Sequence, residues 1–95
     1  MDEATRVCTD LGHRVIELRR ERGWTQEQLA ERSQLDERDV RRIEAGENTT
    51  VHTLVRVAHA FRVSIALLFE PPSSRAVRRL GRPAAPRSLP AAAES

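Results

Sequence analysis

The sequence predicts an all-α protein of five short helices followed by a tail without a stable fold. Apolar residues recur at spacings of three and four up to about residue 70, and no useful length alternates with the period of two typical of strands. Residues that favour helix N-termini precede the last four apolar stretches. All five prolines lie after residue 70. We therefore place the folded unit at residues 1–70 and a flexible Pro/Ala/Arg-rich tail at residues 71–95.

The first two predicted helices each have an apolar face and a recognisable end. In the first, one face carries Cys8, Leu11, Val15 and Leu18, and Gly23 suits the position just after a helix. The second begins at Thr25, because Thr25-Gln26-Glu27-Gln28 has the pattern of a capping box. Its buried side is expected at Leu29 and Ala30.

The remaining three helices start at polar caps. Asp36 suits the N-cap of the third, which carries Val40 and Ile43 and ends at Gly46. The fourth follows Thr50 and the fifth follows Ser64. Their expected buried residues are Val51, Leu54, Val55, Ala58 and Phe61 in the fourth helix, and Ile65, Leu68 and Phe69 in the fifth.

Charge is distributed unevenly along the chain. The net charge is +2 and there is no lysine. Residues 1–70 hold 11 Arg against 13 Asp and Glu, whereas residues 71–95 hold five Arg against Glu94. The excess of positive charge therefore belongs to the tail, and charge alone does not make the folded unit a nucleic-acid-binding protein.

Composition argues against several classes of function. A single cysteine, Cys8, excludes an intramolecular disulfide and a cysteine-based metal cluster. The histidines lack metal-ligand spacing, and no nucleophile–base pair, catalytic carboxylate pair or phosphate loop is present. We expect no enzyme, no cofactor and no metal.

The apolar run Ile65–Phe69 is too short to span a bilayer, and the acidic start lacks a signal peptide. We therefore expect a cytoplasmic protein without membrane contact.

The second and third predicted helices have the dimensions of a helix-turn-helix. Each is about two turns long, and Ser33 to Asp36 joins them. Residues 11–69 resemble the phage-repressor-like (Cro/XRE-type) helix-turn-helix family of bacterial transcriptional regulators. The matching residues are Leu11-Gly12, Leu18-Arg19, Gly23-Trp24-Thr25-Gln26, Leu29-Ala30, Arg42-Ile43-Glu44-Ala45-Gly46, Leu54, Ala58, Ser64 and Leu68-Phe69. The resemblance implies a five-helix lambda-repressor-like DNA-binding domain.

The third predicted helix has the arrangement of a reading helix. On a wheel of about 100° per residue, Val40 and Ile43 face inward while Arg38 and Arg42 project from the opposite side. Arginine can bind guanine through two hydrogen bonds in the major groove. The resemblance implies base-reading positions at Glu37, Arg38, Asp39 and Arg42, and phosphate contacts from Thr25 and Gln26. Arg41, on the flank, either joins the DNA contact or pairs with Glu37.

Two features depart from the family pattern. The third helix opens with Asp36, Glu37 and Asp39, and these carboxylates repel phosphate. They leave three interpretations open: an acid that reads cytosine, modest affinity, or a surface that meets a protein instead of DNA. Gln34 stands where the family turn usually has glycine. A left-handed backbone there would cost a non-glycine residue ~1–2 kcal/mol.

Other residues are assigned to structure and assembly. The resemblance implies a structural ion pair between Arg19 and Glu44. Apolar residues at unusual positions suggest a dimer contact, and they are Ile16, Ala66 and Leu67. The alternative is that Leu67 packs beneath Pro71-Pro72.

Trp24 and Cys8 are expected to be buried. The histidines are expected on the surface of the first and fourth helices, at His13, His52 and His59.

The leading interpretation is a homodimeric transcriptional regulator that reads a palindromic site in double-stranded DNA through its third helix. A helix-turn-helix used for protein–protein contact is an alternative of a different class. A third interpretation keeps DNA binding and adds a protein partner, as in an antitoxin or a restriction-modification controller.

Overall fold

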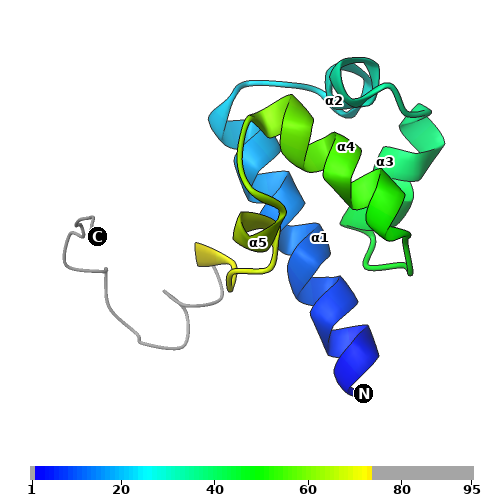
Figure 1. The fold of residues 1–95 in the computed structure, drawn as a ribbon, viewed down its shortest axis with the longest axis vertical. Coiled ribbons are helices and arrows are strands. Elements are labelled where there is room, and N and C mark those ends of the chain that lie inside the picture. Colours follow the sequence, from blue (N-terminus) through cyan, green and yellow to red (C-terminus); the bar gives the residue numbers. More distant parts are fainter. Residues whose placement is uncertain (1, 74–95) are drawn as a thin grey trace, which may run out of the picture.

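The computed structural model describes residues 2–73, and in that range the chain forms five α-helices without a strand (Figure 1). The helices are α1 (Glu3–Glu21), α2 (Gln26–Ser33), α3 (Glu37–Glu44), α4 (Val51–Phe61) and α5 (Ile65–Leu68). The predicted fold class and the order of the helices are confirmed. Most of the predicted tail, residues 74–95, lies outside the described residues.

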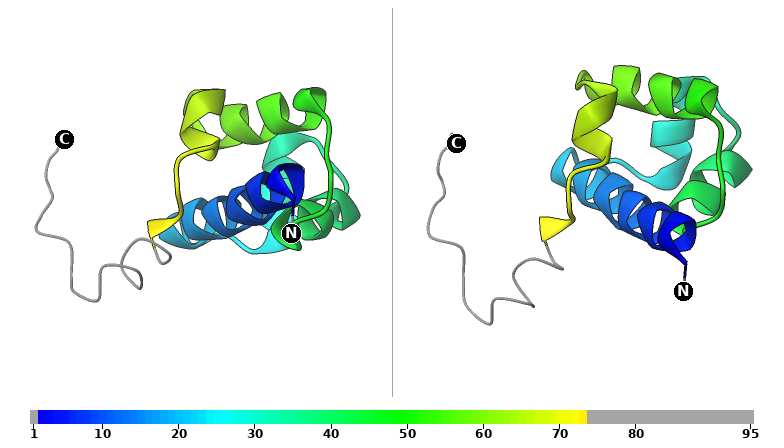
Figure 2. Two further views of the ribbon diagram at one scale, coloured as in Figure 1. Left: turned by 90° about the horizontal axis from the view of Figure 1, so that it is seen from below. Right: turned by 60° about the horizontal axis from the view of Figure 1, so that its bottom comes forward.

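The five helices surround one apolar interior. Figure 2 shows α4 lying across from the long α1, with α3 and α5 near opposite ends of the pair, and α2 packs against α3 and α4. Fully buried side chains come from all five helices, which is expected because packing of an apolar face supplies most of the stability of a helix in a protein. The buried apolar residues are Leu11, Val15, Leu18, Leu29, Ala30, Val40, Ile43, Leu54, Val57, Ala58, Phe61 and Leu68.

Three residues expected in this interior are on the surface. Val51 is 68% exposed, Val55 is 36% exposed and Phe69 is 49% exposed, whereas Val57 is fully buried in their place. Val51 is the first residue of α4 and lies beyond the buried stripe of that helix. Phe69 follows the last residue of α5, so its side chain no longer continues the helical spacing.

Cys8 and Trp24 are less buried than expected, whereas the histidines have the expected exposure. Cys8 is only partly buried, because α1 begins as early as Glu3 and its first turns are exposed. Trp24 is partly buried and packs against the core. All three histidines are exposed, as predicted.

Side-chain caps define two of the predicted helix starts. Thr25 Oγ1 accepts from the Gln28 backbone N–H at 3.0 Å, and Gln28 Oε1 accepts from the Thr25 N–H at 2.8 Å, which confirms the capping box. Thr50 Oγ1 accepts from the Thr53 N–H at 3.1 Å. Asp36 and Ser64 occupy N-cap positions without a side-chain capping bond.

Two backbone positions determine where α3 lies, one through its contact with α1 and one through the turn after α2. A Cβ atom on Gly12 would lie 2.5 Å from the Ile43 carbonyl oxygen, so a side chain there would prevent α1 from approaching α3 this closely. Gln34 ends α2 in the left-handed conformation, with φ 59° and ψ 42°. The chain then turns, and the Leu35 N–H donates to the Ala30 carbonyl at 2.8 Å.

Candidate nucleic-acid interface

The third helix is anchored on one side and exposed on the other. Val40 is fully buried and Ile43 is 2% exposed. Arg38, Arg41 and Arg42 are exposed, while the acidic residues of the first turn, Glu37 and Asp39, are partly buried. The periodicity of the sequence predicted this division between an inner and an outer face of α3.

The outer arginines of α3 differ in their ion-pair partners. Arg41 Nη2 lies 3.4 Å from Glu37 Oε2, and Arg42 Nε lies 3.9 Å from Glu47 Oε1. Pairs this exposed contribute roughly 0–1 kcal/mol, so a phosphate or a base can compete for either guanidinium. Within residues 2–73, no ion pair involves Arg38. The outer face therefore presents one unpaired guanidinium and two weakly held ones.

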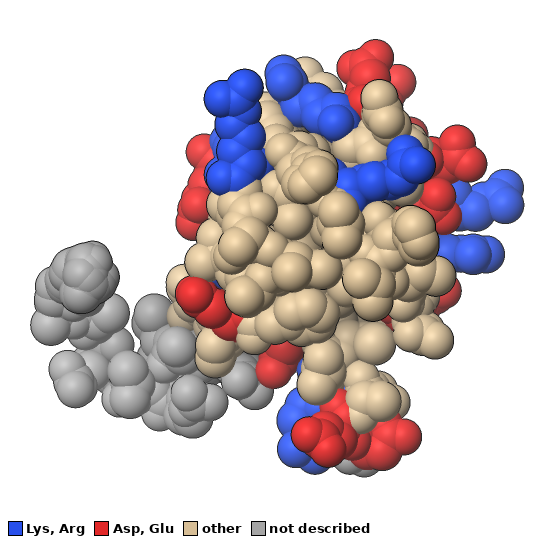
Figure 3. Space-filling view, viewed as in Figure 1, with Lys and Arg blue, Asp and Glu red and all other residues tan. Residues whose placement is uncertain are grey.

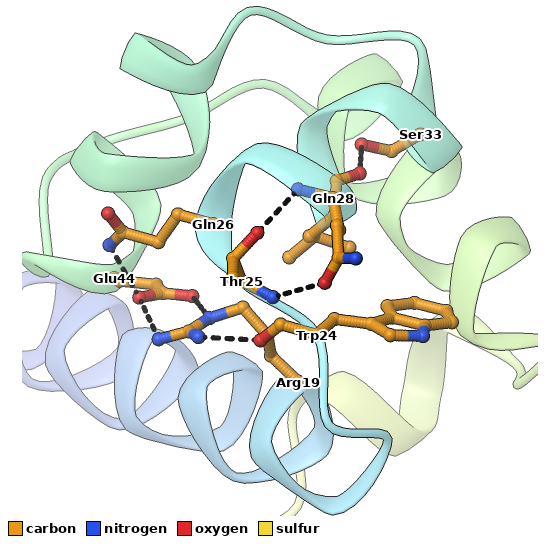
Figure 4. A network of polar contacts seen from close by, with 8 residues as sticks. Arg19, Trp24, Thr25, Gln26, Gln28, Ser33 and Glu44 are labelled. Atoms are coloured by element: carbon orange, nitrogen blue, oxygen red, sulfur yellow. Dashed lines mark hydrogen bonds and ion pairs between the residues drawn. The ribbon is translucent and has the colours of Figure 1, made fainter.

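A buried polar network supports the inner side of α3 (Figure 4). Arg19 on α1 donates to both carboxylate oxygens of Glu44, from Nε to Oε2 at 2.7 Å and from Nη2 to Oε1 at 3.1 Å. Its third nitrogen, Nη1, donates to the Trp24 carbonyl at 2.9 Å. Only 5% of the Glu44 side chain is exposed. This bidentate pair holds the end of α3 against α1 and the start of the α2 segment.

Gln26 has a partner that the sequence did not indicate. Its side-chain Nε2 donates to Glu44 Oε1 at 2.9 Å, so the Gln26 amide belongs to the same network as Arg19. The backbone N–H groups of Gln26 and Glu27, in the first turn of α2, have no intrahelical acceptor. An anion at this end would therefore meet these backbone donors, because the Gln26 side chain is already bonded to Glu44.

A polar hollow adjoins the outer face of α3 and was not predicted. It measures about 170 Å³ and lies where α3 meets the start of α4. The run of Asn and Thr residues after Gly46 was the available signal, because such residues often contact phosphate. The lining residues are Asp39, Arg42, Ile43, Asn48, Thr49, Thr50 and Thr53.

The residues predicted for a dimer contact occupy two helices. Ala66 is exposed on α5, and Leu67 is partly buried beside α1, where its carbonyl accepts from Arg14 Nε at 3.4 Å. Ile16 is partly buried and lines a separate hollow on α1. Figure 3 shows a broad face with few charged side chains over α4 and α5, bordered by arginines and acids. Val55 on α4 and Phe69, directly after α5, are exposed apolar residues that the sequence did not predict.

The segment after α5 folds back along α1. Pro72 is fully buried, and the Ser73 N–H donates to Glu17 Oε1 at 3.0 Å. Among residues 2–73, no helix is long and apolar enough to cross a membrane. The same residues contain no group of three or more side chains positioned to hold a metal ion.

Comparison with known proteins identifies the family. A family model described as Helix-turn-helix matches residues 15–68. The restriction-modification controller protein C.AhdI from Aeromonas hydrophila is 33% identical, with a TM-score of 0.63 over 65% of this chain and 96% of that chain. A hypothetical transcription factor, NHTF, from Neisseria is 26% identical, with a TM-score of 0.68 over 80% and 88% of the two chains.

A third similar structure is a mutant of the restriction-modification controller protein C.Esp1396I. It is 26% identical, with a TM-score of 0.60, and the match covers 81% of this chain and 97% of that chain. A search of curated proteins found no match. Because the family model spans more than half of the sequence, the chain belongs to the Cro/XRE-type helix-turn-helix family of DNA-binding transcription regulators.

Proposed function

We propose that this regulator binds a palindromic site in double-stranded DNA as a homodimer and reads the bases with the outer face of α3. The observation that carries the proposal is the division of α3 into two sides. Val40, Ile43 and Glu44 are buried against the rest of the domain, whereas Arg38 and Arg42 are exposed. A helix held in this way can enter the major groove without losing its packing.

Arg38 and Arg42 are the proposed base-reading cations. Each arginine can donate two hydrogen bonds to one guanine, which discriminates against other bases by about 1–3 kcal/mol. Glu37 and Asp39 accept hydrogen bonds when ionised, so in the groove they favour the amino group of cytosine. The site read by α3 is therefore expected to contain guanine and cytosine.

The first turn of α2 is the proposed phosphate contact. Its unpaired backbone N–H groups and the positive end of the helix dipole favour an anion. Thr25 retains a hydroxyl proton that it can donate, since the capping bond uses its oxygen as the acceptor. Gln26 contributes its backbone, and Arg41 contributes charge at the flank.

The proposed dimer contact is the weakly charged face over α4 and α5. A stable interface buries about 800 Å² on each partner, which is more than Ala66 and Leu67 supply alone. Phe69, which directly follows α5 and is 49% exposed, adds apolar surface at this end of the face. Ile16, which lines a hollow on α1, is a secondary element of the proposal.

Selection of duplexes from a random library with the full-length protein tests the central claim. We expect the enriched sequences to share two inverted half-sites about one helical turn apart. A Leu67→Glu variant should remain folded, become monomeric in light scattering and prefer a single half-site. Enrichment without a shared sequence, or a parent protein that is monomeric on its selected site, would contradict the proposal.

Control of a restriction-modification system is a narrower candidate for the same chain. Two of the similar structures are described as restriction-modification controllers, and the match covers nearly the whole of each. We expect a regulator of this kind to bind upstream of the genes of a restriction-modification system. Chromatin pull-down with tagged full-length protein, followed by sequencing, gives the bound sites. Binding only at unrelated promoters would exclude this candidate.

A further inference from the structure

A cationic hollow lies between α2 and α4, outside the surface proposed to read DNA. It measures about 200 Å³. We name it the α2–α4 hollow, and it is lined by Arg32, Ser33, Gln34, Arg56, His59 and Ala60. No carboxylate and no residue of α3 lines it. Figure 3 shows basic side chains gathered over the end of the molecule where α2 and the second half of α4 meet.

The two arginines of the α2–α4 hollow are held by neutral groups. The Arg32 guanidinium carbon lies 4.5 Å from the centroid of the Trp24 ring, a cation–π contact. Arg56 Nη1 donates to the Gln34 carbonyl at 3.5 Å. Within residues 2–73, neither guanidinium takes part in an ion pair. Both positive charges are therefore oriented but not neutralised, which leaves them available to an external anion.

Gln34 forms the turn at the edge of this hollow. Its φ of 59° lies in the left-handed region, where glycine would avoid a cost of about 1–2 kcal/mol. A polar side chain is nevertheless present at this strained position, and it lines the hollow. Arg62 ends α4 in the same conformation, so the turn at Gln34 shapes the hollow, whereas the charges of the hollow favour a ligand.

We propose that the α2–α4 hollow binds an acidic segment of a protein partner. Carboxylates match the fork of donors on a guanidinium, and two arginines with a histidine can engage successive acidic side chains. The hollow is open and its charged residues are exposed, so a small anion would remain hydrated there and gain little. An extended segment gains several contacts at once. The hollow shares no lining residue with α3, the helix proposed to read DNA.

The test uses octaglutamate peptide as the probe and Trp24 emission as the readout. Trp24 is the only tryptophan, and Arg32 lies on its ring, so occupation of the hollow should change its fluorescence. This local readout matters because the arginines after residue 73 can also attract an acidic peptide. The full-length protein is titrated at physiological ionic strength. A saturable change in Trp24 emission is expected with the peptide and none with inorganic phosphate at equal charge.

Arg56→Glu and Arg20→Glu form a matched pair of variants. Both residues are exposed, and Arg56 has a single long hydrogen bond, so each variant should fold, which circular dichroism checks. Arg56→Glu should lower the affinity for the peptide by about tenfold. Arg20→Glu makes the same change of net charge, and its affinity for the peptide should stay within about twofold of that of the parent.

Four results would overturn the proposal. They are the absence of a saturable emission change, equal weakening by the two variants, an equal emission change with inorganic phosphate, and a loss of DNA affinity in Arg56→Glu as large as that in Arg42→Ala. The last result would assign the hollow to DNA. Failure of DNA binding in the parent protein would contradict the proposed function without affecting the peptide result, so the two proposals fail separately.

Discussion

Each side of α3 carries an ion pair between an arginine and a glutamate, and the inner pair is buried while the outer pair is exposed. On the inner side, Glu44 and Arg19 are almost completely buried and their closest atoms are 2.7 Å apart. On the outer side, Glu37 and Arg41 are 42% and 58% exposed and lie 3.4 Å apart. Burial excludes water from the first pair and leaves the second hydrated. The inner pair therefore fixes the position of α3, while the outer charges stay available for a ligand.

Removal of the inner carboxylate should have the largest effect. Glu44→Ala leaves Arg19 buried without its charge partner and also removes the acceptor for Gln26. We expect a loss of about 3–5 kcal/mol in the free energy of unfolding, a large part of the stability of a small domain. Urea unfolding measures the change. The matched outer variant, Glu37→Ala, should cost less than about 1 kcal/mol. Similar losses in both variants would contradict the comparison.

A side chain at Gly12 should destabilise the packing of α1 against α3 through steric overlap alone. In Gly12→Ala, the new methyl group would overlap the Ile43 and Glu44 carbonyl oxygens, which lie 2.5 Å and 2.9 Å from the Cβ position. We expect a destabilisation of about 1–3 kcal/mol. Thermal unfolding should show a lower Tm with the charges unchanged. A Tm equal to that of the parent would mean that α1 and α3 can separate without cost.

Substitutions on the outer side should affect binding without affecting stability. Arg38→Ala and Arg42→Ala should each weaken binding to the selected duplex by about 1–3 kcal/mol. Their Tm should stay close to that of the parent, because both side chains point away from Val40 and Ile43. Arg20→Ala on α1 is the control for loss of one positive charge. If both α3 variants bind like this control, α3 is not the reading helix.

The smallest expected effect concerns the turn between α2 and α3. Gln34→Gly removes the strain of a left-handed non-glycine residue and should stabilise the domain by roughly 1 kcal/mol, less the greater entropy of glycine in the unfolded chain. Affinity for the selected duplex should not change, because Gln34 lies outside α3. Urea unfolding and a fluorescence-anisotropy titration measure the two quantities. Lower stability would show that contacts of the Gln34 side chain outweigh its strain.

The sequence by itself determined the local features of this protein. Caps such as Thr25, the glycine after α3 and the apolar spacing placed all five helices, because these signals depend on residues within one or two turns. The same spacing assigned Arg38 and Arg42 to the side opposite Val40 and Ile43. The ordered family residues then identified a helix-turn-helix regulator.

Only the tertiary structure decided which residues of different helices meet. The Gln26–Glu44 hydrogen bond joins residues on separate helices, and no spacing along the chain indicates it. Val51 and Phe69 are apolar yet exposed, because each lies at a helix end beyond the contact with its neighbours. The α2–α4 hollow likewise exists only where two helices pack. Periodicity reports which face of a helix is apolar, whereas packing decides how far along the helix that face is covered.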